Sequence, residues 1–161
     1  MKGFWSDKRV TVTGGAGFLG QHLVRRLEGF GAKVFVPRQR DYNLTTLDAS
    51  LRCLLEHPCD VLFHAAAYYG GIGINVNEPA TLYYTNLVMG ANLMEAARLA
   101  KVGKFVAIGT ACSYPGYLEG ELKEADLWAG PCHASVINYG LTKKMMAVQA
   151  QAYKRQYGLD S

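Results

Sequence analysis

The stretch VTVTGGAGFLG, residues 10–20, decides the fold. Its β-branched residues predict a buried strand, and the leucines that follow at helical spacing predict a helix directly after the glycines. Gly14 can take the tight turn, Gly17 lets the backbone approach a phosphate, and Gly20 lets the helix pack closely on the sheet. The alternative is a structural turn that holds no ligand. The strand before the turn and the leucine stripe after it favour a dinucleotide pyrophosphate on the helix N-terminus.

The composition is that of one globular domain. The chain has 161 residues, of which 50% are hydrophobic and 19% charged, with a net charge of +4. This mild positive charge suits an anionic small ligand, and no run of Lys or Arg indicates nucleic-acid binding. No apolar stretch is long enough to span a membrane, and no signal peptide is apparent. The four cysteines, at positions 53, 59, 112 and 132, form no Cys-x-x-Cys pair, so we expect free thiols, a cytoplasmic protein and no metal site.

Strands and helices alternate along the chain. The patterns predict strands at residues 9–13, 33–36, 60–65 and 104–108, and helices at 18–29, 47–56, 80–101 and 139–157. A glycine-rich loop is expected over 68–77 and a long loop over 110–137. This alternation predicts an α/β fold, a Rossmann-type doubly wound parallel sheet with helices on both faces. We expect residues 1–161 to form one NAD(P)-binding domain, the N-terminal part of a longer enzyme with its substrate-binding half elsewhere.

The helix predicted at 80–101 carries no charge from Ala80 to Met94. A helix that is apolar all round is usually buried on two sides. The sheet can cover one side, and either a second subunit or another part of the same chain can cover the other. We favour the second subunit, and therefore a homodimer formed through the helices at 80–101 and 139–157.

The residues after the second predicted strand bear on the choice of nucleotide. An acidic residue about 20 positions past the glycines would hold the ribose 2′-hydroxyl of NAD. The chain has no acid between Glu28 and Asp41 and carries Arg38 and Arg40 instead. A guanidinium matches the oxygens of a 2′-phosphate, so the sequence favours NADP over NAD. The alternative is that both arginines are solvated loop residues.

Tyr139 and Lys143 are spaced to share one face of the last helix. A tyrosine with a pKa near 10 transfers protons poorly at neutral pH. A nearby ammonium favours the phenolate, so we expect Lys143 to lower the pKa of Tyr139. Such a pair can also be an ordinary surface pair. Its position after a dinucleotide turn and a fourth strand favours catalysis.

With these motifs the chain resembles the extended short-chain dehydrogenase/reductase family. Within that family it is most similar to the epimerase/reductases that act on GDP-linked 4-keto sugars. The family-wide likeness rests on Thr13–Gly20, His64–Ala67, Asn86, Thr110, Tyr139 and Lys143. The narrower likeness rests on Gly70-Gly71-Ile72, Cys112-Ser113-Tyr114-Pro115 and the ending Tyr153–Gly158.

The resemblance implies roles for four residues. Thr110 would hydrogen-bond the substrate oxygen, and Tyr139 would protonate the C4 oxygen as NADPH delivers hydride to C4. Lys143 would hold the cofactor ribose. Cys112 would act in epimerisation at C3 and C5, whose protons a 4-keto group acidifies, although a free cysteine is often simply buried. The implied cofactor contacts are Gly14, Gly17, Phe18, Leu19, Gly20, Arg38, Arg40, Ala65, Ala66, Ala67 and Lys143.

The implied reaction converts GDP-4-keto-6-deoxy-mannose to GDP-L-fucose, or acts on a closely related GDP-sugar. Tyr68 and Tyr69 stand where smaller or aliphatic residues are usual, and Thr110-Ala111 replaces the usual Ser-Ser, so the sugar stays open. The alternatives are an NAD-dependent nucleotide-sugar 4-epimerase or another extended family member, and a non-catalytic cofactor-sensing protein. We expect His64 to be structural, and His133 is no substitute for the acid partner of Cys112.

Overall fold

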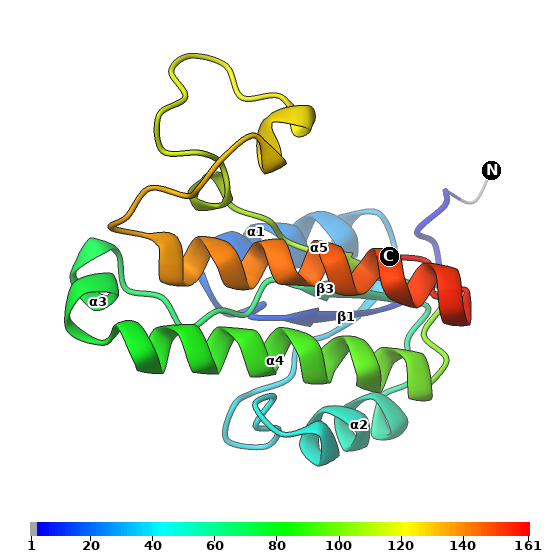
Figure 1. The fold of residues 1–161 in the computed structure, drawn as a ribbon. Helices are drawn as coiled ribbons and strands as arrows, with labels where there is room; N and C mark the ends of the chain where they lie inside the picture. The colour runs from blue at the N-terminus through cyan, green and yellow to red at the C-terminus, as the bar shows by residue number, and fades with distance from the viewer. Residues whose placement is uncertain (1–2) are drawn as a thin grey trace.

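A computed structural model describes residues 3–161. Its centre is a parallel sheet of four strands in the order β2-β1-β3-β4 (Figure 1). The strands are β1 (Arg9–Thr13), β2 (Lys33–Phe35), β3 (Val61–His64) and β4 (Lys104–Ala107). Thr13 pairs with His64, and His64 with Ala107, so the carboxyl ends of three strands meet at one edge. The predicted strands and their parallel arrangement are confirmed.

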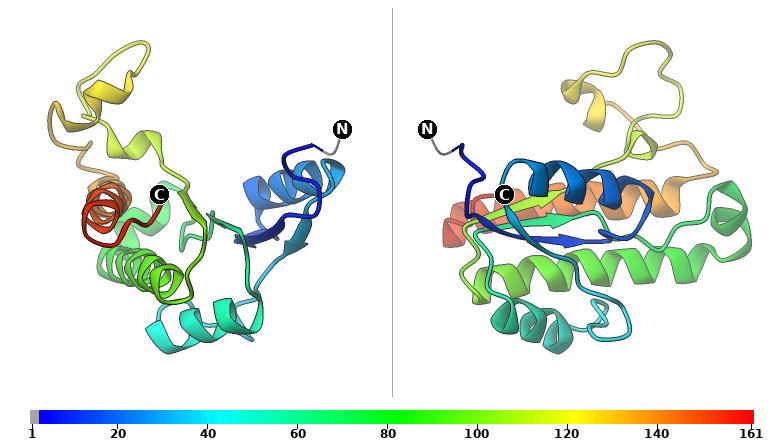
Figure 2. Two further views of the ribbon diagram at one scale, coloured as in Figure 1. Left: turned by 90° about the vertical axis from the view of Figure 1, so that its right-hand side faces the viewer. Right: turned by 180° about the vertical axis from the view of Figure 1, so that it is seen from behind.

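The helices lie on both faces of this sheet, as expected (Figure 2). They are α1 (Phe18–Gly29), α2 (Leu47–Glu56), α3 (Ile72–Asn77), α4 (Pro79–Leu99) and α5 (Ile137–Tyr157). On one face, Leu27 of α1 packs with Val10 and Val12. On the other, Leu62 and Phe105 pack with α2, α4 and α5. The alternating residues of the strands therefore separate two apolar cores.

Helix boundaries follow local signals in the sequence. The Thr46 side chain accepts a hydrogen bond from the Ala49 backbone nitrogen at 3.3 Å and caps α2. Pro79 opens α4, where its missing N–H costs nothing. Helix α4 ends at Leu99, two residues before the predicted end, and Lys101 then takes a left-handed conformation with φ 55°.

The expected loop over residues 68–77 is partly wrong, because Ile72–Asn77 forms α3. Gly71 has φ 79°, which ends the preceding segment, and the Asn75 side-chain amide donates to the Gly71 carbonyl at 2.9 Å. These local bonds allow a short helix in a stretch whose glycines indicated only irregular structure.

Residues 108–136, between β4 and α5, form a long projecting segment, most of which lies away from the sheet (yellow in Figure 1). It contains two 3₁₀ turns, Ala111–Ser113 and Glu124–Trp128, and an antiparallel bridge between Pro115 and Cys132. Helix α5 begins at Ile137, two residues earlier than predicted, so Tyr139 lies in its first turn.

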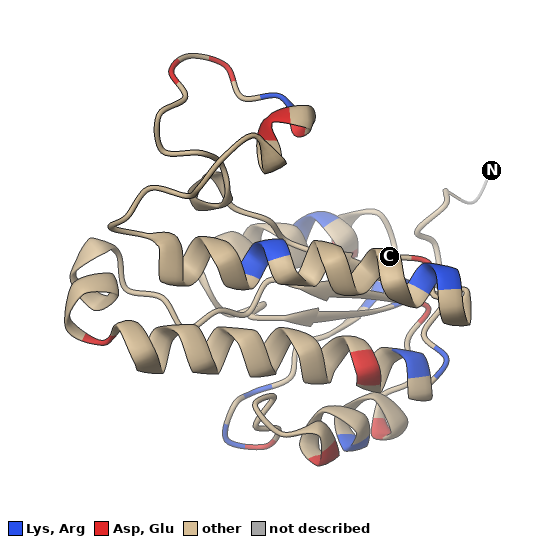
Figure 3. Cartoon of the chain, viewed as in Figure 1, with Lys and Arg blue, Asp and Glu red and all other residues tan. Residues whose placement is uncertain are grey.

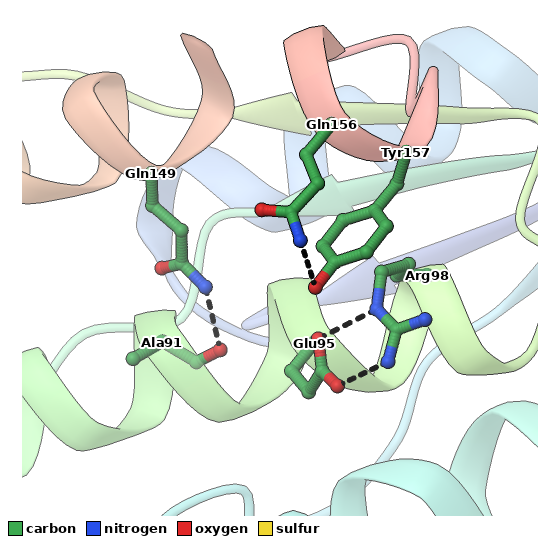
Figure 4. Close-up of polar contacts among 6 residues, drawn as sticks. All are labelled: Ala91, Glu95, Arg98, Gln149, Gln156 and Tyr157. Atoms are coloured by element: carbon green, nitrogen blue, oxygen red, sulfur yellow. Dashed lines mark hydrogen bonds and ion pairs between the residues drawn. The ribbon is translucent and has the colours of Figure 1, made fainter. Parts of the chain in front are cut away.

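Helix α4 is covered on more sides than the sheet alone could provide. It packs against both α2 and α5 (Figure 1). The Gln149 side chain donates to the Ala91 carbonyl at 3.1 Å, and the Arg98 guanidinium lies 4.4 Å from the centre of the Tyr157 ring (Figure 4). Elements of the same chain therefore explain part of its two-sided burial. Within residues 3–161, no helix is long and apolar enough to cross a membrane.

Candidate active site

A cavity of about 340 Å³ lies beyond the carboxyl ends of β1 and β3. Because β2 and β3 flank β1 on opposite sides, this is the position where open α/β sheets bind ligands. The residues that line it include six of the predicted cofactor contacts, Arg38 among them. They are Gly14, Ala16, Gly17, Pro37, Arg38, Gln39, Tyr42, Asn43, Leu44, Thr45, Ala65, Ala66, Ala67, Tyr68, Thr85 and Met89.

The glycine turn at this cavity has room only for backbone. Gly14 has φ 69°, and a Cβ there would lie 2.6 Å from the Ala66 backbone nitrogen. A Cβ at Gly20 would overlap the Gly14 carbonyl oxygen. The turn therefore brings backbone amides and the N-terminus of α1 to the cavity, which fits a dinucleotide pyrophosphate. Phe18 and Leu19, two other predicted contacts, have 86% and 52% of their surface exposed and do not line the cavity.

The two arginines after β2 differ in position. Arg38 lines the cavity. Arg40 does not, and its side chain forms an exposed ion pair with Asp41 at 3.5 Å. Only Arg38 is therefore placed at the cavity where a 2′-phosphate would be bound.

His64 has the structural role expected of it. Its Nδ1 lies 2.8 Å from the Thr13 hydroxyl, whose oxygen also accepts from the Ala66 backbone nitrogen at 3.3 Å. Burial, and secondarily the charge of Lys143, lower the pKa of His64 to about 3, so the imidazole is neutral at pH 7. The pair fixes the backbone after β3 that forms one wall of the cavity.

Tyr139 and Lys143 lie on one face of α5, as predicted. The Lys143 ammonium nitrogen is 5.7 Å from the centre of the Tyr139 ring. Burial lowers the pKa of Lys143 to about 8. Burial first, and then Cys112 and Tyr69, raise the pKa of Tyr139 to about 12. The expected lowering of the Tyr139 pKa is therefore wrong, because desolvation disfavours the phenolate and the neighbouring Cys112 and Tyr69 act in the same direction.

Thr110 and Cys112 follow β4 and meet the start of α5. The Thr110 hydroxyl accepts from the Cys112 backbone nitrogen at 3.2 Å. The Ser113 hydroxyl donates to the Gly140 carbonyl at 2.9 Å, and a Cβ at Gly140 would overlap the Cys112 carbonyl. This close approach of backbones brings Cys112 beside Tyr139. Cys112 is partly exposed, whereas the other three cysteines are buried.

Two residues near Tyr139 and Cys112, namely Asn86 and Tyr69, had no predicted role. The Asn86 side chain accepts from the Tyr68 backbone nitrogen at 2.9 Å and donates to the Tyr68 carbonyl at 2.8 Å. The Tyr69 ring lies against Tyr139, with centres 4.5 Å apart. Asn86 is one of the residues that carry the family resemblance, and Tyr69 belongs to the unusual tyrosine pair, but neither signal predicted these contacts.

Other candidates lie outside this group. His133 is exposed, and its Nδ1 lies 2.8 Å from the Ser135 hydroxyl. Within residues 3–161, no three His, Cys, Asp or Glu side chains are close enough together to hold a metal ion.

The parallel sheet and the turn after β1 define a Rossmann-type domain. The chain belongs to the NAD dependent epimerase/dehydratase family, whose sequence profile matches residues 10–161. This confirms the resemblance to the extended short-chain dehydrogenase/reductases.

Two relatives show the range of the family near this chain. The GDP-L-fucose synthase of Sinorhizobium fredii is 32% identical over 151 residues, which cover 94% of this chain and 48% of that protein. The GDP-mannose 3,5-epimerase 1 of Oryza sativa subsp. indica is 30% identical over 177 residues, covering 98% and 46%. The chain thus spans about half the length of these relatives.

Two solved structures of nucleotide-sugar enzymes share the fold of this chain. The GDP-mannoheptose C4 reductase of Campylobacter jejuni, with NADP bound, has a TM-score of 0.89 at 25% identity, covering 98% of this chain and 50% of that one. The UDP-glucose 4-epimerase of Thermus thermophilus, in complex with NAD, has a TM-score of 0.78 at 29% identity, covering 94% and 52%.

Proposed function

We propose that this chain is the cofactor-binding part of an NADPH-dependent nucleotide-sugar epimerase/reductase. Its substrate would be GDP-4-keto-6-deoxy-mannose, converted to GDP-L-fucose, or a closely related GDP-linked 4-keto sugar. One observation carries the proposal: adjacent residues join the two halves of the site, because Tyr68 lines the cofactor cavity and Tyr69 contacts Tyr139. The names of the GDP-sugar relatives support the substrate class.

Reduction needs a hydride on C4 and a proton on its oxygen. The glycine turn and Arg38 would hold NADPH, whose nicotinamide would supply the hydride. Tyr139, with a pKa of about 12, is protonated at neutral pH and donates its proton to the C4 oxygen, which becomes a hydroxyl. Thr110 hydrogen-bonds the same oxygen, and Lys143 holds the cofactor ribose.

Epimerisation uses the acidity that the 4-keto group gives to its neighbouring carbons. The Cys112 sulfur, as thiolate, removes the proton from C3 or C5, and the electron pair of the broken C–H bond moves into an enolate. A proton from water then adds to the opposite face of that carbon, which restores the ketone with inverted configuration, and the proton on the Cys112 sulfur is lost to solvent. Cys112 is suitable because it is the partly exposed cysteine beside Tyr139.

The direct test is to incubate the intact protein with NADPH and a panel of 4-keto nucleotide sugars, with products identified by mass spectrometry and NMR. We expect a reduced, epimerised GDP-sugar. Turnover of unmodified UDP-sugars with tightly bound NAD would instead establish a 4-epimerase, the alternative favoured by the likeness to the Thermus thermophilus enzyme. Cofactor binding without any turnover would indicate a cofactor sensor.

Replacement of Arg38 by Ala should raise the Kd for NADPH by roughly tenfold or more and leave the Kd for NADH within about twofold. The reason is the loss of one charge-assisted contact to the 2′-phosphate. Titration of the protein's fluorescence with each nucleotide measures both constants. Arg40→Ala should have the smaller effect because Arg40 points away toward Asp41. Equal weakening of NADPH and NADH by Arg38→Ala would contradict the NADP preference.

We also propose a homodimer formed through α4 and α5. The first half of α4 carries no charge (Figure 3), and Tyr84 and Val148 on these helices are 64% and 46% exposed. Val148→Glu should halve the mass measured by light scattering, because it buries a charge in the interface. Val76→Glu, on α3, is the matched control and should keep the mass of the wild type. A monomeric wild type would refute this proposal.

We further propose that the protein works in the cytoplasm. The four free cysteines suit a reducing compartment.

A further inference from the structure

Tyr68 lies on the side of the cofactor cavity that adjoins the proposed proton donor, Tyr139. Tyr68 follows β3 and Arg38 follows β2, and both residues line the cavity. Because β2 and β3 flank β1 on opposite sides, the two residues lie on opposite sides of the glycine turn. The residue after Tyr68 is Tyr69, whose ring centre is 4.5 Å from that of Tyr139. The cavity therefore has Arg38 on one side and Tyr68, next to the proposed chemistry, on the other.

The polar atoms of Tyr68 are bonded to α4 and to the residue before it. The Asn86 side chain accepts from the Tyr68 backbone nitrogen at 2.9 Å and donates to the Tyr68 carbonyl at 2.8 Å. The Tyr68 hydroxyl donates to the Glu78 carboxylate at 2.7 Å. Because these groups are engaged within the chain, Tyr68 offers the carbon atoms of its ring to the cavity. The ring is held at its backbone end by Asn86 and at its hydroxyl end by Glu78.

The two residues that hold Tyr68 are themselves fixed by the helix. Asn86 is only 5% exposed, and its amide also donates to the Leu82 carbonyl at 2.8 Å, one turn earlier in α4. Glu78 directly precedes Pro79, the first residue of α4, so its negative charge stands at the positive end of the helix dipole. The orientation of the Tyr68 ring is therefore set before a ligand arrives. A ligand that packs on this ring does not have to order it first.

We propose that the nicotinamide half of NADPH packs against the ring of Tyr68, and that Glu78 is a positioning residue that holds this ring in place. The inference rests on the proposed function, because it takes the cavity to be the site of NADPH. The 2′-phosphate, which Arg38 would bind, belongs to the adenosine half of the same ligand. Arg38 and Tyr68 therefore contribute to opposite halves of the cofactor, and ligands that contain one half or both can separate their contributions.

The experiment compares NADPH with adenosine 2′,5′-bisphosphate, which keeps the phosphorylated adenosine half and lacks the nicotinamide half. Isothermal titration calorimetry of the intact protein measures the Kd of each. Tyr68→Leu, which removes the ring, should raise the Kd for NADPH roughly tenfold and leave the Kd for the bisphosphate within about twofold. Arg38→Ala should raise both constants, because both ligands carry the 2′-phosphate. A general distortion of the cavity by Tyr68→Leu would weaken the bisphosphate as well as NADPH.

The role of Glu78 is tested through its hydrogen bond to Tyr68. Glu78→Ala and Tyr68→Phe each remove that bond and should raise the Kd for NADPH roughly threefold to fivefold, because the ring must then be ordered on binding. The double variant should show no further loss, since both changes remove the same interaction. Glu78→Gln keeps an oxygen that can accept the bond and should bind NADPH as the wild type does. The control is Tyr117→Phe, which removes a hydroxyl bond to Ala129 in the projecting segment and should change neither Kd.

The possible failures are distinguishable. If Tyr68→Leu weakens both ligands equally, or neither of them, the Tyr68 ring makes no specific contact with the nicotinamide half and the inference is wrong. Additive losses in the double variant would contradict the positioning role of Glu78. A wild type that binds neither NADPH nor the bisphosphate would instead overturn the proposed function, and the inference with it.

Discussion

Tyr139→Phe in the intact protein lowers the rate of reduction by roughly 10²- to 10⁴-fold and leaves the Kd for NADPH unchanged. This result is expected because the phenol supplies the only proton in the proposed reduction, and a positioned general acid contributes about that factor. The ring itself stays, so its contacts with Tyr69 and Lys143 are kept. Stopped-flow absorbance of NADPH measures the rate, and fluorescence titration measures binding.

Tyr157→Phe is the control at the far end of the same helix, where the hydroxyl only accepts from Gln156 at 3.0 Å. It should reduce substrate at the wild-type rate. The pH dependence gives a further check, because a Tyr139 pKa of about 12 keeps the phenol protonated across the neutral range. Loss of reduction only as the pH rises toward that value is expected of this group. If Tyr139→Phe turned over normally, another group would have to supply the proton.

Gly20→Ala has the largest effect expected on stability. The added Cβ would overlap the Gly14 carbonyl and lie 2.7 Å from the Gly15 Cα, both of which are backbone atoms that cannot rotate away. We expect a loss of about 1–3 kcal/mol in the free energy of unfolding and loss of NADPH binding as the turn shifts. Urea denaturation followed by circular dichroism measures the first, and fluorescence titration the second.

Gly29→Ala is the matched control, because Gly29 lies in the same helix with nothing within 4 Å of its missing Cβ. That change should raise the free energy of unfolding by roughly 0.5–1 kcal/mol, since alanine favours helix over glycine. Similar destabilisation in both variants would mean that helix α1, and not the turn, is sensitive to substitution.

The sheet could be predicted from the sequence because each strand is a short apolar run between clear turn signals. Val61–His64, for example, follows a proline and precedes three alanines. Helix α3 could not be predicted, because it depends on the Asn75 bond to Gly71 and not on a periodic apolar pattern. The start of α5 was predicted two residues too late, because no side chain caps this helix and the sequence therefore carries no signal for its first residue.

The sequence identified those site residues whose own side chains carry the proposed chemistry. It did not identify the contacts and pKa shifts that depend on residues distant in the sequence. Tyr139 and Lys143 are confirmed on one face of α5, but the direction of the Tyr139 pKa shift depends on burial, which sequence spacing does not show. Arg38 and Arg40 are equivalent in sequence, and only the turn of the chain after β2 places Arg38 at the cavity. Tyr69 contacts Tyr139, which lies 70 residues further along, and its neighbour Tyr68 is held by Asn86, so neither contact could be read from local sequence.

The projecting segment is closed at its base. The bridge between Pro115 and Cys132 is reinforced by the bond from the Gly116 nitrogen to the Pro131 carbonyl at 3.1 Å. Its chain therefore leaves and re-enters the fold at one point, as in a hairpin. Residues can be inserted or deleted beyond that neck at little entropic cost and without displacing Thr110 or Tyr139. The length and sequence of the projecting segment can therefore change during evolution while the positions of Thr110 and Tyr139 are kept.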